Sequence, residues 1–347
     1  MNSVLIPNHK YIYNIVKQPN FIYKYVLLGE STHGTNEYYE IRSNITKSLI
    51  KNKNFNCIFL EMEWSLGYQV NRFIHSQINM STKQFLRNTF KYYPKWMWCN
   101  EHIRKLLNYL KNYNRKNMNK IYVYGVDVQN IELAKENVCD DPTINCKIVK
   151  NIIENYDIMS GSSNYWDIRD TMWSKIIEEN KQSFTENFKF VLWAHNSHIG
   201  NVKAHINSPN TLNIGYILID KYENDVFNIG FTTYNGYVTA TNKWGEKSKV
   251  MKIKNAHTNS YEHIFHNICE SMNIDSILLI SKTGKIKVPK KSFIYNLPPK
   301  PKYIRYIGVI YNKQNELDSH YSYTNIQHEF NLVIHIDNTS SIETFCE

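Results

Sequence analysis

Residues 29–42, GESTHGTNEYYEIR, bring a carboxylate, a hydroxyl and an imidazole together within four positions. The segment is close to G-x-S-x-G, the turn that carries the nucleophilic serine of many hydrolases. That turn requires a glycine two residues after the serine, and His33 occupies this position instead. Because the Cβ of His33 would crowd the strained turn, the pattern favours His33 over Ser31 as the reactive residue.

His33 has the chemistry of a general base. An imidazole can take a proton from water in the physiological pH range. Such a base needs a partner that fixes its tautomer, and Glu30 and Glu61 are both candidates. Arg42 follows on the predicted next helix. It either extends its stem along the apolar face, anchors one of these carboxylates, or stabilises an oxyanion.

Several polar residues share one position relative to the predicted strands. Apolar, mainly β-branched runs predict strands at residues 26–29, 57–62, 121–128, 190–195, 226–233, 276–281, 304–311 and 332–337. The residues at or just after the ends of these runs include Glu30, Glu61, Asp127, His195 and, three positions later, His198. Each alone is explained by a helix cap or an isolated ion pair. Together they predict one pocket, because ligands bind outside the carboxyl ends of parallel strands.

Amphipathic stretches alternate with the early strands and define the fold class. Tyr38, Ile41, Ile45 and Leu49, for example, recur at helical spacing. We therefore predict an α/β fold with a mainly parallel central sheet flanked by helices. We expect a single domain over residues 1–347, with lid-like helical segments at about 80–115 and 140–182 covering the site. Residues 139–164 predict a helix after a loop, and residues 241–260 a polar loop.

Composition and charge narrow the function classes. The formal charge is +10, but the basic residues are scattered and carry no nucleic-acid-binding signature, so nucleic acid is an unlikely partner. No apolar run is long enough to span a bilayer and no signal peptide is recognisable, which predicts a cytoplasmic protein with no membrane partner. The six cysteines include no C-x-x-C pair; Cys57 reads as a core thiol, and a disulfide framework is not expected.

The histidines give no diagnostic metal motif. His195-Asn196-Ser197-His198 follows a predicted strand and is not the helical H-E-x-x-H of zinc peptidases. His33, the two later histidines and the glutamates supply suitable ligand types, so a divalent metal remains possible. Their spacing does not indicate one, and we predict that no cofactor or metal is required.

Several ordered blocks resemble the erythromycin esterase family, which includes succinoglycan-biosynthesis-type homologues. The opening LGESTHGTNEYYEIR is similar to the family's G-E-x-x-H-G block, and FLEMEW to its second acidic strand. YPKWMWCNEHIRKLLNYLKNYN, VYGVDVQN and VLWAHNSHIGN resemble later blocks. The likeness runs from about residue 27 to the C-terminus. It implies that His33 is the base that activates water, and that the other active-site groups are Glu30, Glu61, Arg42, His195 and His198.

One block departs from the family pattern. RDTMWSKII keeps Arg169 and Asp170, but Met172 comes early and Lys175 stands where an asparagine is expected. That helix could line the substrate cleft, so the resemblance does not carry macrolide specificity with it.

A substrate cleft would be lined by Tyr92, Trp96, Trp98, Asp127 and Asn196, although core packing explains the aromatic residues equally well.

The residues and the resemblance together predict a hydrolase in which a His33-activated water attacks a small-molecule ester. The resemblance adds a macrolide lactone as the expected substrate and antibiotic resistance as the expected role. His195 or His198 would donate to the oxyanion or protonate the leaving alkoxide. One alternative is a transferase or hydrolase acting on acylated polysaccharide or another natural product. A second is a non-enzymatic basic binding protein on the same fold. The oligomeric state is not predicted.

Overall fold

The computed structural model describes residues 3–137, 147–184, 187–207, 210–281 and 286–346. Its main sheet is formed by β1 (Ser3–Ile6), β2 (Tyr25–Leu28), β3 (Cys57–Glu63), β4 (Tyr122–Asp127), β5 (Phe190–Trp193), β6 (Val226–Ala240), β7 (Lys249–Ile253), β8 (Ser276–Ile280), β9 (Phe293–Tyr295) and β12 (Leu332–Thr339). Two further strands, β10 (Lys302–Arg305) and β11 (Tyr321–Thr324), form a separate antiparallel pair.

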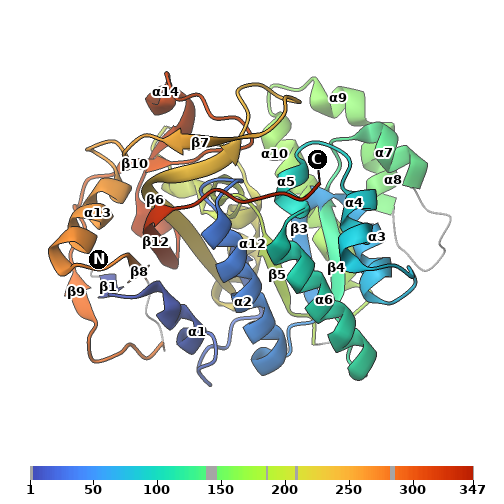
Figure 1. The fold of residues 1–347 in the computed structure, drawn as a ribbon, viewed down its shortest axis with the longest axis horizontal. Coiled ribbons are helices and arrows are strands. Elements are labelled where there is room, and N and C mark those ends of the chain that lie inside the picture. Colours follow the sequence, from blue (N-terminus) through green and yellow to red (C-terminus); the bar gives the residue numbers. More distant parts are fainter. Residues whose placement is uncertain (1–2, 138–146, 185–186, 208–209, 282–285, 347) are drawn as a thin grey trace.

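The main sheet has the order β4-β3-β5-β2-β6-β12-β8-β1-β9, with β7 paired to β6 (Figure 1). The six strands from β4 to β12 run parallel, and β8, β1 and β9 extend the sheet antiparallel. The predicted mainly parallel α/β architecture is confirmed. The carboxyl ends of β2, β3, β4 and β5 meet at one edge, where the predicted polar residues gather.

Helices cover both faces of this sheet (Figure 1). Those on one face include α1 (Ile12–Ile15), α2 (Asn36–Lys53), α3 (Trp64–Ile74), α4 (Thr82–Thr89) and α6 (Glu101–Lys116). Those on the other include α10 (Tyr165–Lys181), α12 (Ile214–Tyr222) and α13 (Tyr261–Met272). The remaining α-helices among the described residues are α5 (Lys95–Trp98), α7 (Ile131–Asn137), α8 (Lys147–Glu154), α9 (Tyr156–Ser160), α11 (Asn196–Ile199), α14 (Glu316–His320) and α15 (Ile326–Glu329).

Buried apolar side chains explain why these helices lie where they do. Ile45 and Leu49 of α2 are fully buried against the sheet, and Leu106 and Leu110 extend the same core from α6. Asn100 caps α6 by accepting a hydrogen bond from the backbone N–H of Ile103. Burial of one apolar face per helix is the expected source of stability for this layered arrangement. Among the helices in the described ranges, none has the length and apolar character needed to cross a membrane.

Four sequence-based expectations about elements differ from the structure. The predicted strand at 304–311 is only the short β10, followed by isolated bridges of Ile307 and Ile310 to other segments. The predicted loop at 241–260 contains β7. Within 80–115, α6 is a regular flanking helix packed on α2 and α3, and only the segment around α5 reaches over the site. Of the predicted 139–164 helix, residues 139–146 lie outside the described residues, and the rest divides into α8 and α9.

The cysteines also differ from expectation. Cys99 and Cys346 form a disulfide across 247 residues of sequence, with their Cα atoms 5.8 Å apart. The spacing of the cysteines gave no sign of this pair, because the C-terminal segment reaches Cys99 only through the tertiary fold. Cys57 and Cys269 are free and buried, and Cys57 lies in the core as predicted.

Candidate active site

The turn that carries His33 joins β2 to α2 and is packed against the sheet. Gly29 leaves room for the side chain of Asn196: a Cβ at Gly29 would lie 2.1 Å from its Oδ1. Gly34 touches β6, where a Cβ would lie 1.9 Å from the backbone oxygen of Thr239. The backbone N–H of Thr239 donates to the carbonyl of Gly34. The two glycines of the motif thus permit close backbone packing, which holds the turn in place.

His33 is the outer member of a buried relay. Its Nδ1 lies 2.9 Å from Oε1 of Glu30, and the guanidinium of Arg42 donates to Oε2 of the same carboxylate. Arg42 is 1% exposed and stacks over the rings of Tyr39 and Trp193. Arg42 therefore holds Glu30, and Glu30 holds the imidazole, as in other charge-assisted pairs.

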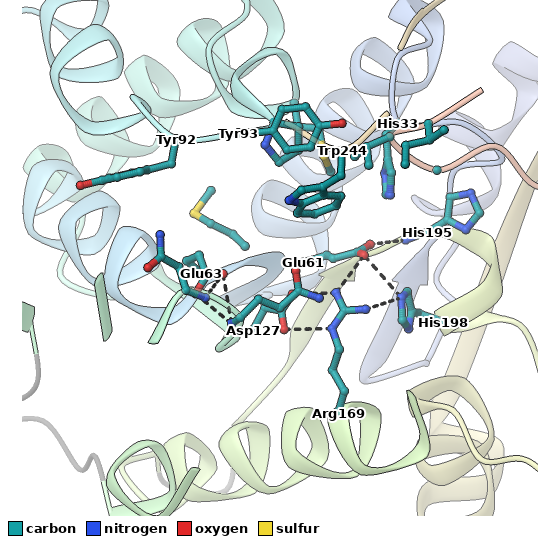
Figure 2. Close-up of a pocket in the computed structure, with 18 of the residues that line it drawn as sticks. His33, Glu61, Glu63, Tyr92, Tyr93, Asp127, Arg169, His195, His198 and Trp244 are labelled. Carbon is teal, nitrogen blue, oxygen red and sulfur yellow. Dashed lines mark hydrogen bonds and ion pairs between the residues drawn. The ribbon is translucent and has the colours of Figure 1, made fainter. Parts of the chain in front are cut away.

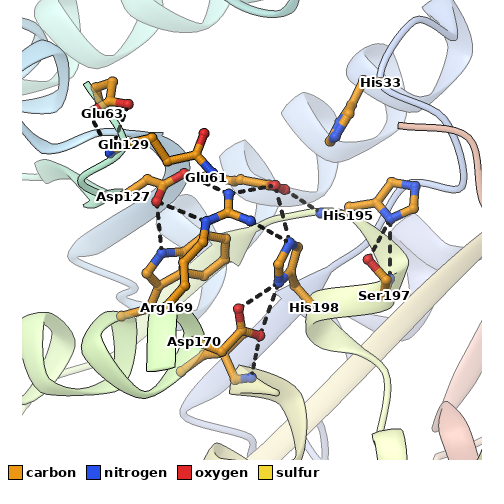
Figure 3. Close-up of polar contacts among 12 residues, drawn as sticks. His33, Glu61, Glu63, Asp127, Gln129, Arg169, Asp170, His195, Ser197 and His198 are labelled. Atoms are coloured by element: carbon orange, nitrogen blue, oxygen red, sulfur yellow. Dashed lines mark hydrogen bonds and ion pairs between the residues drawn. The ribbon is translucent and has the colours of Figure 1, made fainter. Parts of the chain in front are cut away.

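A second network lies across the cavity from His33, centred on Arg169 of α10 (Figure 3). Arg169 binds the carboxylate of Asp127 through two nitrogens, at 3.0 and 2.6 Å. Its guanidinium also lies 3.5 Å from Oε1 of Glu61 and 3.4 Å from Nε2 of His198. The neighbouring Asp170 contacts Nδ1 of His198 at 2.8 Å. Arg169 thus neutralises two buried carboxylates.

The charges around His198 favour its protonated form. Burial of the ring alone would lower the pKa of His198, but Asp170 and Glu61 outweigh this effect and raise it. His195 behaves in the opposite way, because burial and the neighbouring His33 and His198 hold its pKa well below the ordinary value. His198 is therefore the better proton donor of the two near neutral pH, and His195 is neutral.

Both networks open into one cavity of about 880 Å³ (Figure 2). Of the predicted site residues, those that line it are His33, Glu61, Tyr92, Trp98, Asp127, His195 and His198. Tyr92, Tyr93 and Trp244 lie on the opposite side from Asp127 and Arg169. A cavity of this size is large enough for a drug-sized molecule.

Four predicted residues lie elsewhere. Glu30 and Arg42 stand behind His33 and contact the cavity only through it. The substrate-contacting positions expected for Trp96 and Asn196 are wrong. Trp96 is 2% exposed and packs in the core, and the amide of Asn196 is fully buried with hydrogen bonds to the backbone of Phe231 at both ends.

The side chains of Ser31 and His195 are both held by hydrogen bonds. The hydroxyl of Ser31 is buried and pairs with that of Tyr38 at 2.9 Å, away from the cavity lining. The ring of His195 lies 4.9 Å from that of His33. Nδ1 of His195, however, contacts Ser197, and its Nε2 is buried. The backbone N–H of His195 donates to Glu61 at 2.7 Å, so this residue positions a carboxylate.

Sequence reasoning did not assign Arg169, Asp170 or Glu63 to the site. The signal for the first two was present: a charged pair lies directly before Trp173 and Ile177 on the buried face of α10. Glu63 ends β3 and accepts hydrogen bonds from the backbone of Gln129 and Asn130. Its position facing Asp127 follows from strand register, which the sequence alone does not give.

Glu63 supplies a pH test of this geometry. Burial and the charge of Asp127 raise the pKa of Glu63 to about 8, so its carboxyl is protonated in the folded chain at pH values where the unfolded chain has released that proton. Between about pH 4.5 and 8 the unfolded state binds fewer protons, and this group makes the protein less stable as pH rises.

The side chain of the Glu63→Gln variant is neutral at every pH. We therefore expect the free energy of unfolding of this variant to rise relative to that of wild type as pH increases through this window. The gain should grow by at most about 1.4 kcal/mol per pH unit. Urea unfolding at pH 5, 6, 7 and 8 measures it. A stability difference that does not change with pH would show that Glu63 ionises normally.

One donor atom each from Glu30, His33 and Glu61 lies within 4.8 Å of the others, a geometry that could hold a metal ion. The guanidinium of Arg42 is bonded to Glu30, however, and its positive charge opposes a cation there. The donor set has suitable chemistry, but its electrostatics favour the hydrogen-bonded relay over a metal.

The fold and the two networks define an α/β protein in which ionisable side chains gather at the carboxyl edge of the sheet. The family model described as erythromycin esterase matches residues 50–141 and 134–339, and the chain belongs to this family. The match begins after the His33 turn, so Glu30, His33 and Arg42 lie outside it. Membership supports a hydrolase-type function in broad terms.

Solved structures share the fold at low sequence identity. A structure described as a succinoglycan biosynthesis protein is 18% identical, covers 96% of this chain and 91% of its own, and has a TM-score of 0.70. A Bacillus cereus protein is also 18% identical, with coverages of 96% and 92% and a TM-score of 0.64. A histidine-to-asparagine variant of the erythromycin esterase EreC, in its open conformation, is 14% identical, with coverages of 95% and 93% and a TM-score of 0.60.

Proposed function

We propose that the protein hydrolyses a carboxylic ester or lactone by direct attack of a water molecule activated by His33. The orientation of this ring carries the proposal. Nδ1 is held by Glu30, whereas Nε2 has no hydrogen-bond partner among the described residues, and the ring lines the cavity. A neutral imidazole held in this way carries its proton on Nδ1, which leaves the Nε2 lone pair available to water.

The reaction follows from the positions of the carboxylates. In the proposed reaction, a water in the cavity lies beside Nε2 of His33 and faces Glu61, because both residues line the cavity. Nε2 takes one proton, and the hydroxide adds to the carbonyl carbon to give a tetrahedral oxyanion. The intermediate then expels the alkoxide as the carbon–oxygen bond breaks, and the alkoxide takes up a proton. No covalent bond to the protein forms.

Arg169 and protonated His198 supply positive charge on the side of the cavity opposite His33. Preorganised positive groups of this kind stabilise an oxyanion without reorganisation during the reaction. His198 is also the better donor to the leaving alkoxide, because Asp170 and Glu61 raise its pKa. We assign His195 a positioning role, through its backbone bond to Glu61.

A pH–rate profile tests the assignment of His198. Asp170→Asn removes the charge that favours the imidazolium but keeps an oxygen for the backbone N–H of Ile214. We expect the pKa of His198 to fall, so that the alkaline limb of kcat/KM against pH moves to lower pH by about 1 unit. NMR titration verifies that the pKa of His198 has fallen. If it has and the alkaline limb does not move, His198 is not the proton donor.

The aromatic lining of the cavity fits two classes of substrate. Tyr92, Trp166 and Trp244 are strongly exposed aromatic residues of the cavity lining and can cover an apolar macrolide ring or the faces of sugars. A transferase or hydrolase acting on acylated polysaccharide is therefore the second candidate, with a sugar hydroxyl in place of water in the transferase case. We infer a small-molecule substrate and no required metal, in agreement with the charge of Arg42 beside Glu30.

The decisive experiment incubates chelator-treated protein with a 14-membered macrolide and with a panel of acylated sugars, and follows the mass of each product. Gain of one water without a protein adduct, in wild type and in Ser31→Ala, supports direct hydrolysis. A stable acyl adduct on the protein would contradict it. Transfer of the acyl group to added sugar selects the transferase, and turnover that returns only with added metal contradicts the metal-free mechanism.

A further inference from the structure

A second group of donors lies where α13 crosses β12, which we call the α13–β12 cluster: Cys269, His335 and Asp337. His335 and Asp337 are two residues apart on β12, so their side chains share the sheet face that α13 covers. Cys269 comes from α13. One donor atom from each residue lies within 4.8 Å of the other two.

The cluster is separate from the candidate active site. None of its three residues belongs to the cavity lining. Cys269 and His335 are buried, whereas the side chain of Asp337 is 21% exposed and gives the cluster an opening to solvent. A free thiol, an imidazole and a carboxylate therefore converge beneath a partly open surface.

Neighbouring side chains hold two of the three donors. Nδ1 of His335 pairs with Oγ1 of Thr232 at 3.0 Å, which turns Nε2 toward Asp337. The carboxylate of Asp337 contacts Nδ1 of His266 at 2.9 and 3.0 Å, and Nε2 of His266 lies 3.5 Å from Glu270. Metal-binding histidines and carboxylates are typically oriented by such outer hydrogen bonds.

The distance between the histidine and aspartate donors suits a small tetrahedral ion. Ligands at about 2.0–2.3 Å from zinc stand roughly 3.3–3.8 Å apart. Nε2 of His335 and Oδ1 of Asp337 are 3.4 Å apart, inside this range. The combination of thiolate, imidazole and carboxylate selects zinc over magnesium or calcium, which prefer oxygen alone.

We propose that Cys269, His335 and Asp337 bind one zinc-type divalent ion, with water in the fourth position. His266 is a positioning residue that orients Asp337. The ion would join α13 to β12 and stabilise this part of the sheet. Binding releases the thiol proton of Cys269 to solvent, because the thiolate is the ligand form.

Cobalt(II) titration of the chelator-treated, full-length protein tests the site without reference to activity. We expect one equivalent to produce the near-ultraviolet charge-transfer band of a cobalt thiolate, and zinc to remove it. Cys269→Ser should lose the band completely. Two control variants should keep the band. Cys57→Ser changes a buried free cysteine elsewhere in the core, and His33→Ala disrupts the donor cluster in the candidate active site.

Two further variants keep the test independent of folding. Asp337→Asn should weaken cobalt binding at least tenfold, and His266→Ala roughly 10–100-fold, with far-ultraviolet circular dichroism unchanged. No band in wild type, or a band that survives in folded Cys269→Ser, would overturn the proposal. So would cobalt binding that is lost in His33→Ala and unaffected by Asp337→Asn.

Discussion

His33→Ala is expected to lower kcat roughly 10²–10⁴-fold, the usual contribution of a positioned general base. His33 is 7% exposed and its ring is held by Glu30, so the variant loses the Nε2 that we place beside the attacking water. KM should change little, because the base acts on water and contributes to the transition state more than to substrate binding. Steady-state kinetics on the substrate identified by mass measures both constants.

The control for this variant is His328→Ala. His328 is an exposed histidine of α15, and its removal should leave kcat unchanged. Glu30→Gln provides an intermediate case, since it keeps a hydrogen-bond acceptor for His33 but removes the charge that stabilises the imidazolium. If His33→Ala keeps the wild-type kcat in a preparation verified to be free of wild-type protein, His33 is not the base.

Arg169→Met is expected to destabilise the protein by about 3–5 kcal/mol. Arg169 is 7% exposed, and its guanidinium binds Asp127 through two hydrogen bonds while it approaches Glu61. Its loss leaves two carboxylates in the site without their shared cation. Because typical domains are stable by only about 5–15 kcal/mol, urea unfolding at pH 7 should show the change clearly.

A double variant separates this charge effect from a simple loss of packing. Adding Asp127→Asn removes one uncompensated charge but keeps an oxygen for Nε1 of Trp173 and the N–H of Val128. The double variant should recover at least half of the lost stability. Arg104→Met, which breaks the exposed pair with Glu101, should cost less than about 1 kcal/mol. Equal losses at Arg169 and Arg104 would contradict the buried network.

The sequence predicted the parallel sheet because its strands are continuous apolar runs that buried parallel strands require. It also predicted that Glu61, Asp127 and His195 would come together, since each lies at or just after the end of such a run, and all three line one cavity. The catalytic roles of the site residues remain predictions.

The errors arose where contacts depend on the tertiary fold. Asn196 follows a strand just as His195 does, and only the three-dimensional structure shows its amide filling the space beside Gly29. Trp96 and Trp98 are two residues apart on a short helix, and one packs inward while the other lines the cavity. The antiparallel extension of the sheet and the Cys99–Cys346 disulfide join segments too distant in sequence for local patterns to pair.

The segment after β12 affects the order in which the site can be completed during synthesis. Ile342 donates a backbone hydrogen bond to Gly34 beside His33, and Asn36 donates one to Ser340. Thr344 and Phe345 bond to the backbone of Cys99, next to Trp98. A ribosome-bound chain that already contains every proposed catalytic residue would still lack these supports. We expect such a nascent chain to remain inactive until residues 340–346 have emerged and docked.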